Sequence, residues 1–270
     1  MAREFDFYIV PTPIGNISDI TIRAVDILKQ VDLIACEDTR TTQKLLNHYD
    51  IKTKTVSYHK YNEKERVELF LNHLNSGKKM ALVSDAGTPM ICDPGNIIVE
   101  ELINKGFSVT SLPGACAVTT FLSQIPRCSE EFTFIGFIPR TEGQIADIVK
   151  KYCNSNIVFY DSPERIIKTL KVILRERGDI KIVLGRELSK IFEEVKCGQV
   201  SEILNYYSDG IKGEIVCMIY SDENVNDIDI DQKIKELKLK DFKDKEISII
   251  LSTLYGYNKN QVYKKSLSVV

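Results

Sequence analysis

Several patterns that define whole protein classes are missing from this sequence of 270 residues. No apolar run approaches the roughly 20 residues that a membrane helix needs, and the chain does not open on a basic segment followed by a long apolar one. The seven cysteines form no C-x-x-C pair and are odd in number, which disfavours a disulfide framework or a structural zinc site. We therefore expect a protein of the reducing cytoplasm, with no membrane partner and no metal, whose cysteines mostly lie in the core.

An excess of charge of either sign is also missing. The formal net charge is -2, with 43% hydrophobic and 27% charged residues, an ordinary composition for a soluble globular protein. Any contact with nucleic acid must therefore come from a local basic patch. The length suffices for two domains of ordinary size.

The common signatures of nucleotide-binding loops are absent as well. The sequence contains neither the G-x-G-x-x-G fingerprint of dinucleotide folds nor the G-x-x-x-x-G-K-[ST] phosphate loop. It also lacks the acidic, glycine-rich loop of the commonest methyltransferase fold. A ligand site in this chain must be built from other loops.

Residues 1–120 show an alternation of strands and helices. Apolar, strand-like runs are predicted at residues 5–11, 32–36, 79–84 and 107–112, and helices at residues 21–30, 63–76 and 94–105. We expect Asp93 to cap the last of these helices and Gly106 to end it. This rhythm predicts a first α/β domain with a mostly parallel sheet.

The pattern changes after about residue 120. Residues 121–222 are expected to form a second α/β domain, with a helix at 163–177 and short strands at 133–138, 157–160, 182–188, 194–200 and 214–220. An acidic stretch at 221–231 suggests a linker. Residues 232–270 carry nine lysines against four acidic residues, a net charge of +5, and are expected to form a small helical module with helices near 247–254 and 258–267. Its charge suits either RNA contact or a solvated surface.

Three short loops follow predicted strands of the first domain. They span residues 10–16, 84–89 and 112–117, and each is rich in small residues, proline or glycine. Each loop alone is explained by turn chemistry, but three at the carboxyl ends of parallel strands predict one ligand crevice. Backbone amides would form most of it, and Asp85 is its one candidate charged contact.

These loops and several later segments resemble a known family. The segments are 8–16 (YIVPTPIGN), 37–40 (EDTR), 81–89 (ALVSDAGTP), 93–95 (DPG) and 112–114 (LPG), followed by 134–139 (FIGFIP), 159–165 (FYDSPER), 185–190 (GRELSK) and 255–264 (YGYNKNQVYK). They resemble the tetrapyrrole methylase superfamily and, within it, the bacterial ribosomal RNA small subunit methyltransferase I branch. Tetrapyrrole methylases usually begin with a V-G-x-G-P-G type loop, which this chain replaces with Pro-Thr-Pro-Ile-Gly-Asn, and this difference favours the RNA branch.

The resemblance implies a fold of two α/β domains of the tetrapyrrole methylase type, known as class III methyltransferases, with a cofactor cleft between them and a helical module at the end. It implies methylation of the ribose 2′-hydroxyl of a cytidine in the decoding region of 16S rRNA, with S-adenosylmethionine as cofactor, the small ribosomal subunit as partner and a homodimer as the assembly. The residues that it implies for cofactor binding are Pro13, Gly15, Asp85, Gly87, Thr88, Pro113, Gly114, Ala115 and Cys116.

A ribose hydroxyl is a poor nucleophile, so a nearby base would assist its reaction. The candidate carboxylates are Glu37, Asp38, Asp161 and Glu187. Each has a structural alternative: residues 37–39 could cap a helix that begins near Thr41, and Glu187 could pair with Arg40 or Arg186. The basic and aromatic candidates for RNA contact are Arg23, Arg40, His59, Lys60, Arg140, Arg165, Arg186 and Lys190, each of which could equally be a solvated surface group.

Two other functions stay open on the sequence. One is methylation of a tetrapyrrole, such as a precorrin or uroporphyrinogen, with the same cofactor and fold. The other is a cofactor-sensing protein that binds RNA without catalysis.

Overall fold

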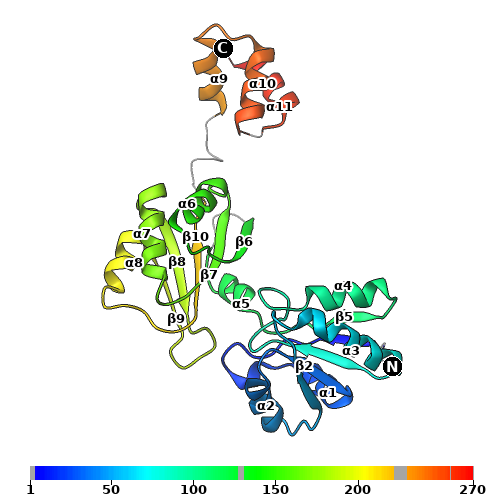
Figure 1. The fold of residues 1–270 in the computed structure, drawn as a ribbon. Helices are drawn as coiled ribbons and strands as arrows, with labels where there is room; N and C mark the ends of the chain where they lie inside the picture. The colour runs from blue at the N-terminus through cyan, green and yellow to red at the C-terminus, as the bar shows by residue number, and fades with distance from the viewer. Residues whose placement is uncertain (1–3, 127–130, 222–229, 256, 270) are drawn as a thin grey trace.

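The computed structural model describes residues 4–126, 131–221, 230–255 and 257–269 of the chain. These residues form two five-stranded sheets and a cluster of C-terminal helices (Figure 1). The two sheets confirm the predicted α/β class, and each was expected in its own half of the chain.

The first sheet is entirely parallel, with strand order β3-β2-β4-β1-β5. Its strands are β1 (Phe7–Ile9), β2 (Leu33–Cys36), β3 (Lys54–Ser57), β4 (Met80–Val83) and β5 (Val109–Ser111). Successive residues point to opposite faces, so Tyr8 packs toward one pair of helices while Phe7 and Ile9 pack toward the other. Both faces are covered, which explains why the central strands β1, β2 and β4 read as apolar runs. The edge strand β3 lacks this signal and was not predicted.

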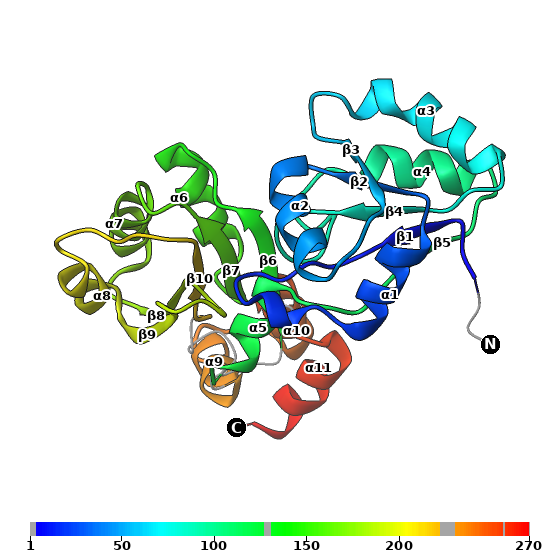
Figure 2. The same cartoon turned by 90° about the horizontal axis from the view of Figure 1, so that it is seen from below.

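Helices lie on both faces of this sheet (Figure 2). Leu28 of α1 (Ile22–Gln30) and Leu46 of α2 (Thr39–His48) pack on one face. Phe70 of α3 (Glu63–Asn75) and Ile98 of α4 (Asn96–Asn104) pack on the other. A short 3-10 helix, η1 (Ile17–Asp19), precedes α1.

The second sheet is mixed, with strand order β6-β7-β10-β8-β9. Only β6 and β7 are parallel neighbours, and the other pairs are antiparallel. The strands are β6 (Phe132–Phe137), β7 (Asn156–Asp161), β8 (Lys181–Arg186), β9 (Glu194–Gln199) and β10 (Ile215–Ile219). The helices α6 (Glu142–Lys151), α7 (Ile166–Arg177) and α8 (Val200–Tyr206) cover one face.

The other face of the second sheet packs against the first half of the chain. Phe121 of α5 (Ala117–Ser123) and Ile14 of the loop after β1 belong to the same apolar cluster as Val158 and Val183 of the sheet. Gly185 lets α5 approach closely, because a Cβ there would lie 2.8 Å from the Phe121 ring. The predicted domain boundary at residue 120 falls inside α5, which carries the chain from one sheet to the other.

The helix predicted at residues 94–105 begins later than expected, and the prediction that Asp93 caps it is wrong. Gly95 is the N-cap of α4, with φ of 142°, and no side chain caps the helix. A Cβ at Gly95 would lie 2.6 Å from Met90 Cγ and 2.9 Å from Leu82 Cδ2. The chain therefore turns sharply at this glycine, and Asp93 stays in the loop before the helix.

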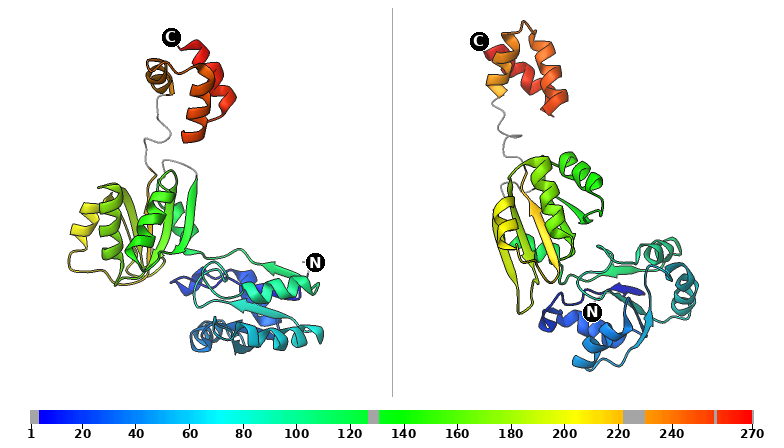
Figure 3. Two further views of the ribbon diagram at one scale, coloured as in Figure 1. Left: turned by 45° about the horizontal axis from the view of Figure 1, so that its top comes forward. Right: turned by 60° about the vertical axis from the view of Figure 1, so that its left-hand side comes forward.

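Three C-terminal helices form a small cluster of their own (Figure 3). They are α9 (Ile230–Lys238), α10 (Asp244–Tyr255) and α11 (Lys259–Ser268), and Ile234, Ile247, Leu251 and Val262 form their core. The two helices predicted from the sequence correspond to α10 and α11, whereas α9 was not predicted. Most of the predicted linker, residues 222–229, lies outside the described residues.

The cysteines are less buried than expected. Cys36 and Cys217 lie in the core, but Cys92 and Cys197 are exposed and Cys116 and Cys153 are half-buried. An apolar sequence neighbourhood misled the prediction, because Cys92 follows β4 in a loop and Cys197 lies on the edge strand β9. No helix in the described part of the chain combines the length and apolar character needed to cross a membrane.

Candidate functional site

The three loops singled out in the sequence do converge at the carboxyl edge of the first sheet. They follow β4, β1 and β5, which are neighbours in that sheet. The backbone N–H groups of Thr12 and Gly87 donate to each other's carbonyl oxygens at 2.9 and 3.0 Å. The Thr88 hydroxyl donates to the Ala115 carbonyl at 2.9 Å. Hydrogen bonds thus join all three loops into one rigid rim.

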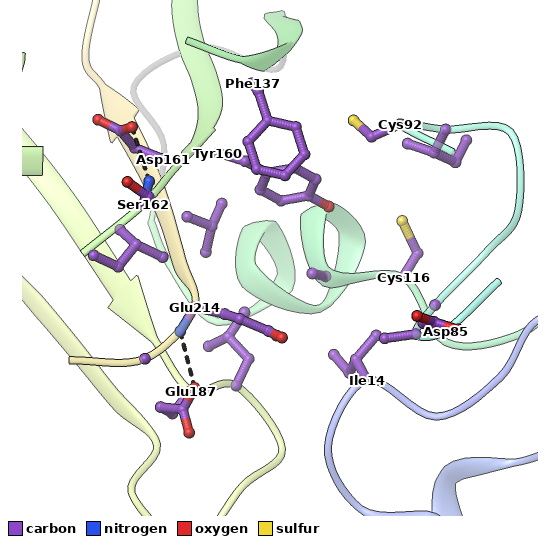
Figure 4. Close-up of a pocket in the computed structure, with 18 of the residues that line it drawn as sticks. Ile14, Asp85, Cys92, Cys116, Phe137, Tyr160, Asp161, Ser162, Glu187 and Glu214 are labelled. Carbon is purple, nitrogen blue, oxygen red and sulfur yellow. Dashed lines mark hydrogen bonds between the residues drawn. The ribbon is translucent and has the colours of Figure 1, made fainter. Parts of the chain in front are cut away.

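A cavity of about 680 Å³ lies where this rim meets the second sheet (Figure 4). The first half of the chain contributes Ile14 and the loops after β4 and β5. The second half contributes the ends of β6 and β7, part of the loop at residues 187–190, and residues 213–216, where β10 begins. Its volume falls within the range of pockets for small ligands, about 300–1,000 Å³. The cavity is therefore the candidate ligand site of the molecule.

Four of the expected cofactor residues line this cavity, namely Asp85, Gly87, Thr88 and Cys116. The other five lie outside the lining and are Pro13, Gly15, Pro113, Gly114 and Ala115. Ile14, between Pro13 and Gly15, and Cys116, next to Ala115, do line the cavity. The Asp85 side chain is fixed at one oxygen, which accepts the backbone N–H of Asp38 at 3.0 Å.

Two flanking glycines allow close contacts that a side chain would prevent. A Cβ at Gly114 would lie 2.5 Å from Pro11 Cβ, and one at Gly15 would lie 2.5 Å from Lys190 Cγ. Gly15 thus lets the loop after β1 pack against residues 188–190 of the second half. The contact sets how closely the two walls of the cavity approach each other.

Two of the four candidate catalytic carboxylates are held by structural contacts. Asp38 is the N-cap of α2 and accepts the backbone N–H of Arg40 at 2.8 Å, and its ion pair with the Arg40 side chain helps lower its pKa to about 2. Asp161 is buried and accepts hydrogen bonds from the Ser162 N–H at 2.8 Å and from the Thr169 hydroxyl at 2.6 Å. The capping alternative is therefore correct for Asp38, in a helix that begins at Thr39 rather than Thr41.

Glu187 lines the cavity but also has partners within the chain. Its carboxylate accepts the backbone N–H of Glu214 and the Lys190 ammonium, each at 2.9 Å, and these bonds lower its pKa. The sequence alternatives, pairing with Arg40 or Arg186, are wrong because Arg40 binds Asp38 and Arg186 binds Glu194. Glu187 adopts φ of 51°, a conformation unusual for a residue other than glycine.

Glu37 differs from the other three carboxylates. It is half-buried at the end of β2, and no hydrogen bond or ion pair holds it among the described residues. Burial raises its pKa above the ordinary value of 4.5, as do the nearby charges of Asp85 and Asp93, while His59 acts in the opposite direction. A carboxylate without partners and with a raised pKa suits proton transfer.

Of the basic candidates, only Lys190 lines the cavity. Its ammonium is bound by Glu187 and lies 3.2 Å from a carboxylate oxygen of Glu214. The remaining candidates lie outside the lining: Arg40, Arg165 and Arg186 are in ion pairs, Arg23, Lys60 and Arg140 are exposed, and His59 is half-buried with no partner for Nδ1 among the described residues.

The sequence did not single out several residues of the cavity wall. Asp93 is one of them, and burial raises its pKa above 3.8. The sequence signal for Asp93 is the segment 93–95, which the prediction of a helix cap explains in another way. Phe137, Tyr160 and Glu214 were also missed, because they come from the second sheet, where the sequence shows no loop pattern comparable to that of the first. Within the described ranges, no group of three or more His, Cys, Asp or Glu side chains is placed to hold a metal ion.

Comparisons with known proteins agree on the family. The family model of the tetrapyrrole (corrin/porphyrin) methylases matches residues 6–204. Ribosomal RNA small subunit methyltransferase I of Vibrio cholerae is 38% identical, with 96% of this chain and 93% of the relative covered. The protein of the same name from Halalkalibacterium halodurans is 43% identical over 78% of this chain and 74% of the relative.

Solved structures share the fold at low sequence identity. A diphthine synthase matches with a TM-score of 0.65 and 15% identity, covering 80% of this chain and 89% of its own. A uroporphyrin-III C-methyltransferase from Thermus thermophilus, in complex with S-adenosylhomocysteine, matches with a TM-score of 0.57 and 18% identity, covering 78% and 96%.

The family model and the sequence relatives cover most of this chain, and the cavity lies among the segments that carry the likeness. The chain therefore belongs to the tetrapyrrole methylase family and, within it, to the S-adenosylmethionine-dependent methyltransferases named ribosomal RNA small subunit methyltransferase I.

Proposed function

We propose that the protein transfers a methyl group from S-adenosylmethionine to the ribose 2′-hydroxyl of a cytidine in the decoding region of 16S rRNA, within the small ribosomal subunit. The main support for an RNA substrate is the 38% identity to the Vibrio cholerae relative over 96% of this chain. The choice of hydroxyl, nucleoside and region rests on the resemblance of segments such as 8–16 and 81–89. The same resemblance supports a homodimer, and the odd number of cysteines without a C-x-x-C pair favours the reducing cytoplasm.

The chemistry of the cavity wall fits S-adenosylmethionine, which joins cationic sulfonium and ammonium groups to a ribose and an adenine. Asp85 and Glu214 offer carboxylates to its cations and hydroxyls, and Ile14, Leu188 and Val216 offer apolar surface to its adenine. When bound, the cofactor supplies a methyl group activated by the positive charge on sulfur. We infer that the residues holding it are Pro13, Gly15, Asp85, Gly87, Thr88, Pro113, Gly114, Ala115 and Cys116.

The chain then has to orient the acceptor hydroxyl in line with the methyl group and remove its proton. Glu37 is the carboxylate that we propose as the proton acceptor. It lies just outside the cavity lining, at the end of β2 and beside β4, whose following loop carries Asp85. Asp38, Asp161 and Glu187 are better suited to hold the surrounding structure, since other groups of the chain already occupy their oxygens.

A direct assay tests this function. Purified protein and radiolabelled S-adenosylmethionine are incubated with unmethylated small ribosomal subunits or, separately, with uroporphyrinogen. We expect label in 16S rRNA and none in the tetrapyrrole. Label in the tetrapyrrole but not in RNA would refute the proposal, as would binding of the cofactor and the subunit without any transfer.

The role of Asp85 is testable by substitution. Asp85→Ala should weaken the affinity for S-adenosylhomocysteine by more than about tenfold, which corresponds to roughly 1.4 kcal/mol, because a carboxylate facing the cavity is removed. Titration calorimetry measures this, and Asp209→Ala, at an exposed position outside the cavity, serves as the matched control. Unchanged affinity in a folded Asp85→Ala protein would remove Asp85 from the binding site.

A further inference from the structure

One aromatic side chain of the cavity wall is left open to solvent. Phe137, the last residue of β6, is 61% exposed although it lines the cavity. Phe134 pairs with Val158 of β7 and Phe137 with Tyr160, so β6 holds one residue more than its partner strand between these two pairs. Gly136 takes φ of 71° at this irregularity. Such a bulge changes the direction of the following side chain and is frequent beside active sites.

Phe137 is the most exposed of three aromatic rings that pack in a row, at tilted and edge-to-face angles. Its centroid lies 5.5 Å from that of Tyr160, and Tyr160 lies 5.2 Å from Phe134 in an edge-to-face contact. Tyr160, itself packed against Phe134, supports one side of the Phe137 ring, and both Phe137 and Tyr160 line the cavity. The ring is thus held by its neighbours while a large part of its surface stays available to a planar ligand.

The loop after β4 faces this ring. A Cβ at Gly136 would lie 3.5 Å from the Cys92 sulfur, so residues 91–93 stand next to the bulge. Figure 4 shows Phe137, Tyr160 and Cys92 at one end of the cavity, with Ile14 and Glu187 at the other. The half-buried Asp93 directly follows Cys92 in this loop, and both residues line the cavity.

We propose that the space between Phe137 and residues 91–93 receives the unpaired target base of the RNA, with Phe137 stacking on the face of the base and Asp93 accepting a hydrogen bond from its exocyclic amine. This inference rests on the proposed function. A duplex or a ribosomal subunit cannot enter a cavity of about 680 Å³, so only a base turned out of its stack reaches the interior. Aromatic rings commonly receive such bases.

The two ends of the cavity differ in a way that assigns the base to the Phe137 end. The end of the cavity near Gly15 and Gly87 is formed by a rim of hydrogen-bonded backbone. Such a rim suits a small ligand that is held along its whole length. The Phe137 end combines an exposed ring with the half-buried side chain of Asp93 in the cavity wall, and burial raises the pKa of that carboxyl. An amine donor beside Asp93 would favour its ionised form, and carboxylates are established acceptors for the N4 amine of cytosine.

Substitution of Phe137 tests the stacking. Phe137→Ala should lower kcat/KM for small ribosomal subunits by about 10- to 100-fold, the range expected for the loss of one base–aromatic stack, while Phe137→Tyr should stay within about threefold of wild type. Calorimetry should find the affinity for S-adenosylhomocysteine unchanged. Phe132→Ala is the matched control, since Phe132 lies on the same strand, is 42% exposed and is not part of the cavity wall.

Three results would overturn the stacking role. They are wild-type kcat/KM in Phe137→Ala, an equal loss in Phe132→Ala, or a Phe137→Ala protein that loses cofactor affinity instead. A wild-type protein that leaves small subunits unmethylated would instead refute the proposed function itself, before any variant is compared.

Substitution of Asp93 tests the recognition of the amine. The substrates are reconstituted small subunits that carry cytidine or uridine at the target position. Wild-type protein should prefer cytidine, because uracil offers a carbonyl where cytosine offers an amine. Asp93→Asn should reduce this preference at least tenfold without changing the affinity for S-adenosylhomocysteine. An unchanged preference, or a loss of cofactor affinity, would contradict the assignment.

Discussion

At the scale of single residues, the candidate catalytic carboxylates differ in their hydrogen-bond partners. Asp161 and Glu187 line the cavity, yet hydrogen bonds from Thr169 and Lys190 already occupy them. Glu37 has a raised pKa, and no other group in the described part of the chain binds its oxygens, as a base requires. The sequence could nominate these acids from their motifs, but it could not rank them, since their partners come from other strands and helices.

The substitution Glu37→Gln tests whether Glu37 is the base. A base acts only when ionised, so wild-type kcat should rise with pH through the pKa of Glu37, which burial holds above 4.5. Glu37→Gln should lose this rise and reduce kcat by about 10²- to 10⁴-fold, with the affinity for S-adenosylhomocysteine retained. The measurement is kcat for methyl transfer to small subunits, determined across pH for both proteins. A variant within threefold of wild-type kcat would exclude Glu37 as the base.

At the scale of elements, the first half of the chain was predictable and the second half less so. Parallel strands buried on both faces leave a clear apolar signal, and the loops after β1, β4 and β5 were correctly expected to meet. The start of α4 was misplaced because an Asp-Pro-Gly segment reads as a cap, whereas Gly95 makes a turn that depends on the positions of Met90 and Leu82. The bulge at Gly136 likewise depends on pairing with β7, which a single sequence does not reveal.

At the same scale, substitution of Gly213 tests whether the loop that precedes β10 shapes the cavity. It has φ of 96°, and a Cβ there would lie 2.4 Å from Glu187 Cγ. Gly213→Ala should displace Glu187 and weaken the affinity for S-adenosylhomocysteine by about tenfold, roughly 1.4 kcal/mol. Gly210→Ala is the matched control, because Gly210 has φ of 93° but no atom within 4 Å of a Cβ. Equal affinities in the two variants would show that contact with Glu187 does not shape the site.

Glu194 gives a second element-scale prediction, on the edge strand β9. Hydrogen bonds from Tyr206, Tyr207 and Arg186, at 2.7, 2.8 and 2.9 Å, lower its pKa to about 2. Glu194→Gln should reduce the free energy of unfolding at pH 7 by about 1–3 kcal/mol, measured by chemical denaturation. The exposed control Glu68→Gln should change it by less than about 0.5 kcal/mol.

The pH dependence of this difference has a defined sign. The folded pKa of Glu194 lies below its ordinary value of 4.5, so its contribution is complete above that value and is lost as the pH falls toward about 2. The difference between wild type and Glu194→Gln should therefore be constant from pH 7 to about 5 and shrink below it. A difference that grows as the pH falls would contradict the assignment.

At the scale of the whole molecule, neither sheet makes the cavity alone. The β8–β9 loop bridges the two halves: the Ser189 hydroxyl bonds to Asp19, Lys190 packs beside Gly15, and the Gln124 side chain donates to Glu193 at 3.0 Å. The first sheet supplies the rim of hydrogen-bonded loops, and the second supplies Phe137, Tyr160, Glu187 and Glu214. The sequence indicated a cleft between two domains only through the family resemblance, because contacts between distant loops leave no local pattern.

The proposed function is defined by the atom that receives the methyl group. The most direct measurement incubates the purified protein with unmethylated small subunits and isotope-labelled S-adenosylmethionine, digests the 16S rRNA to nucleosides and identifies the labelled product by mass spectrometry. We predict label in 2′-O-methylcytidine, from one site in the decoding region. Label on a base carbon or nitrogen, on another nucleoside, or no label in the RNA would contradict the account.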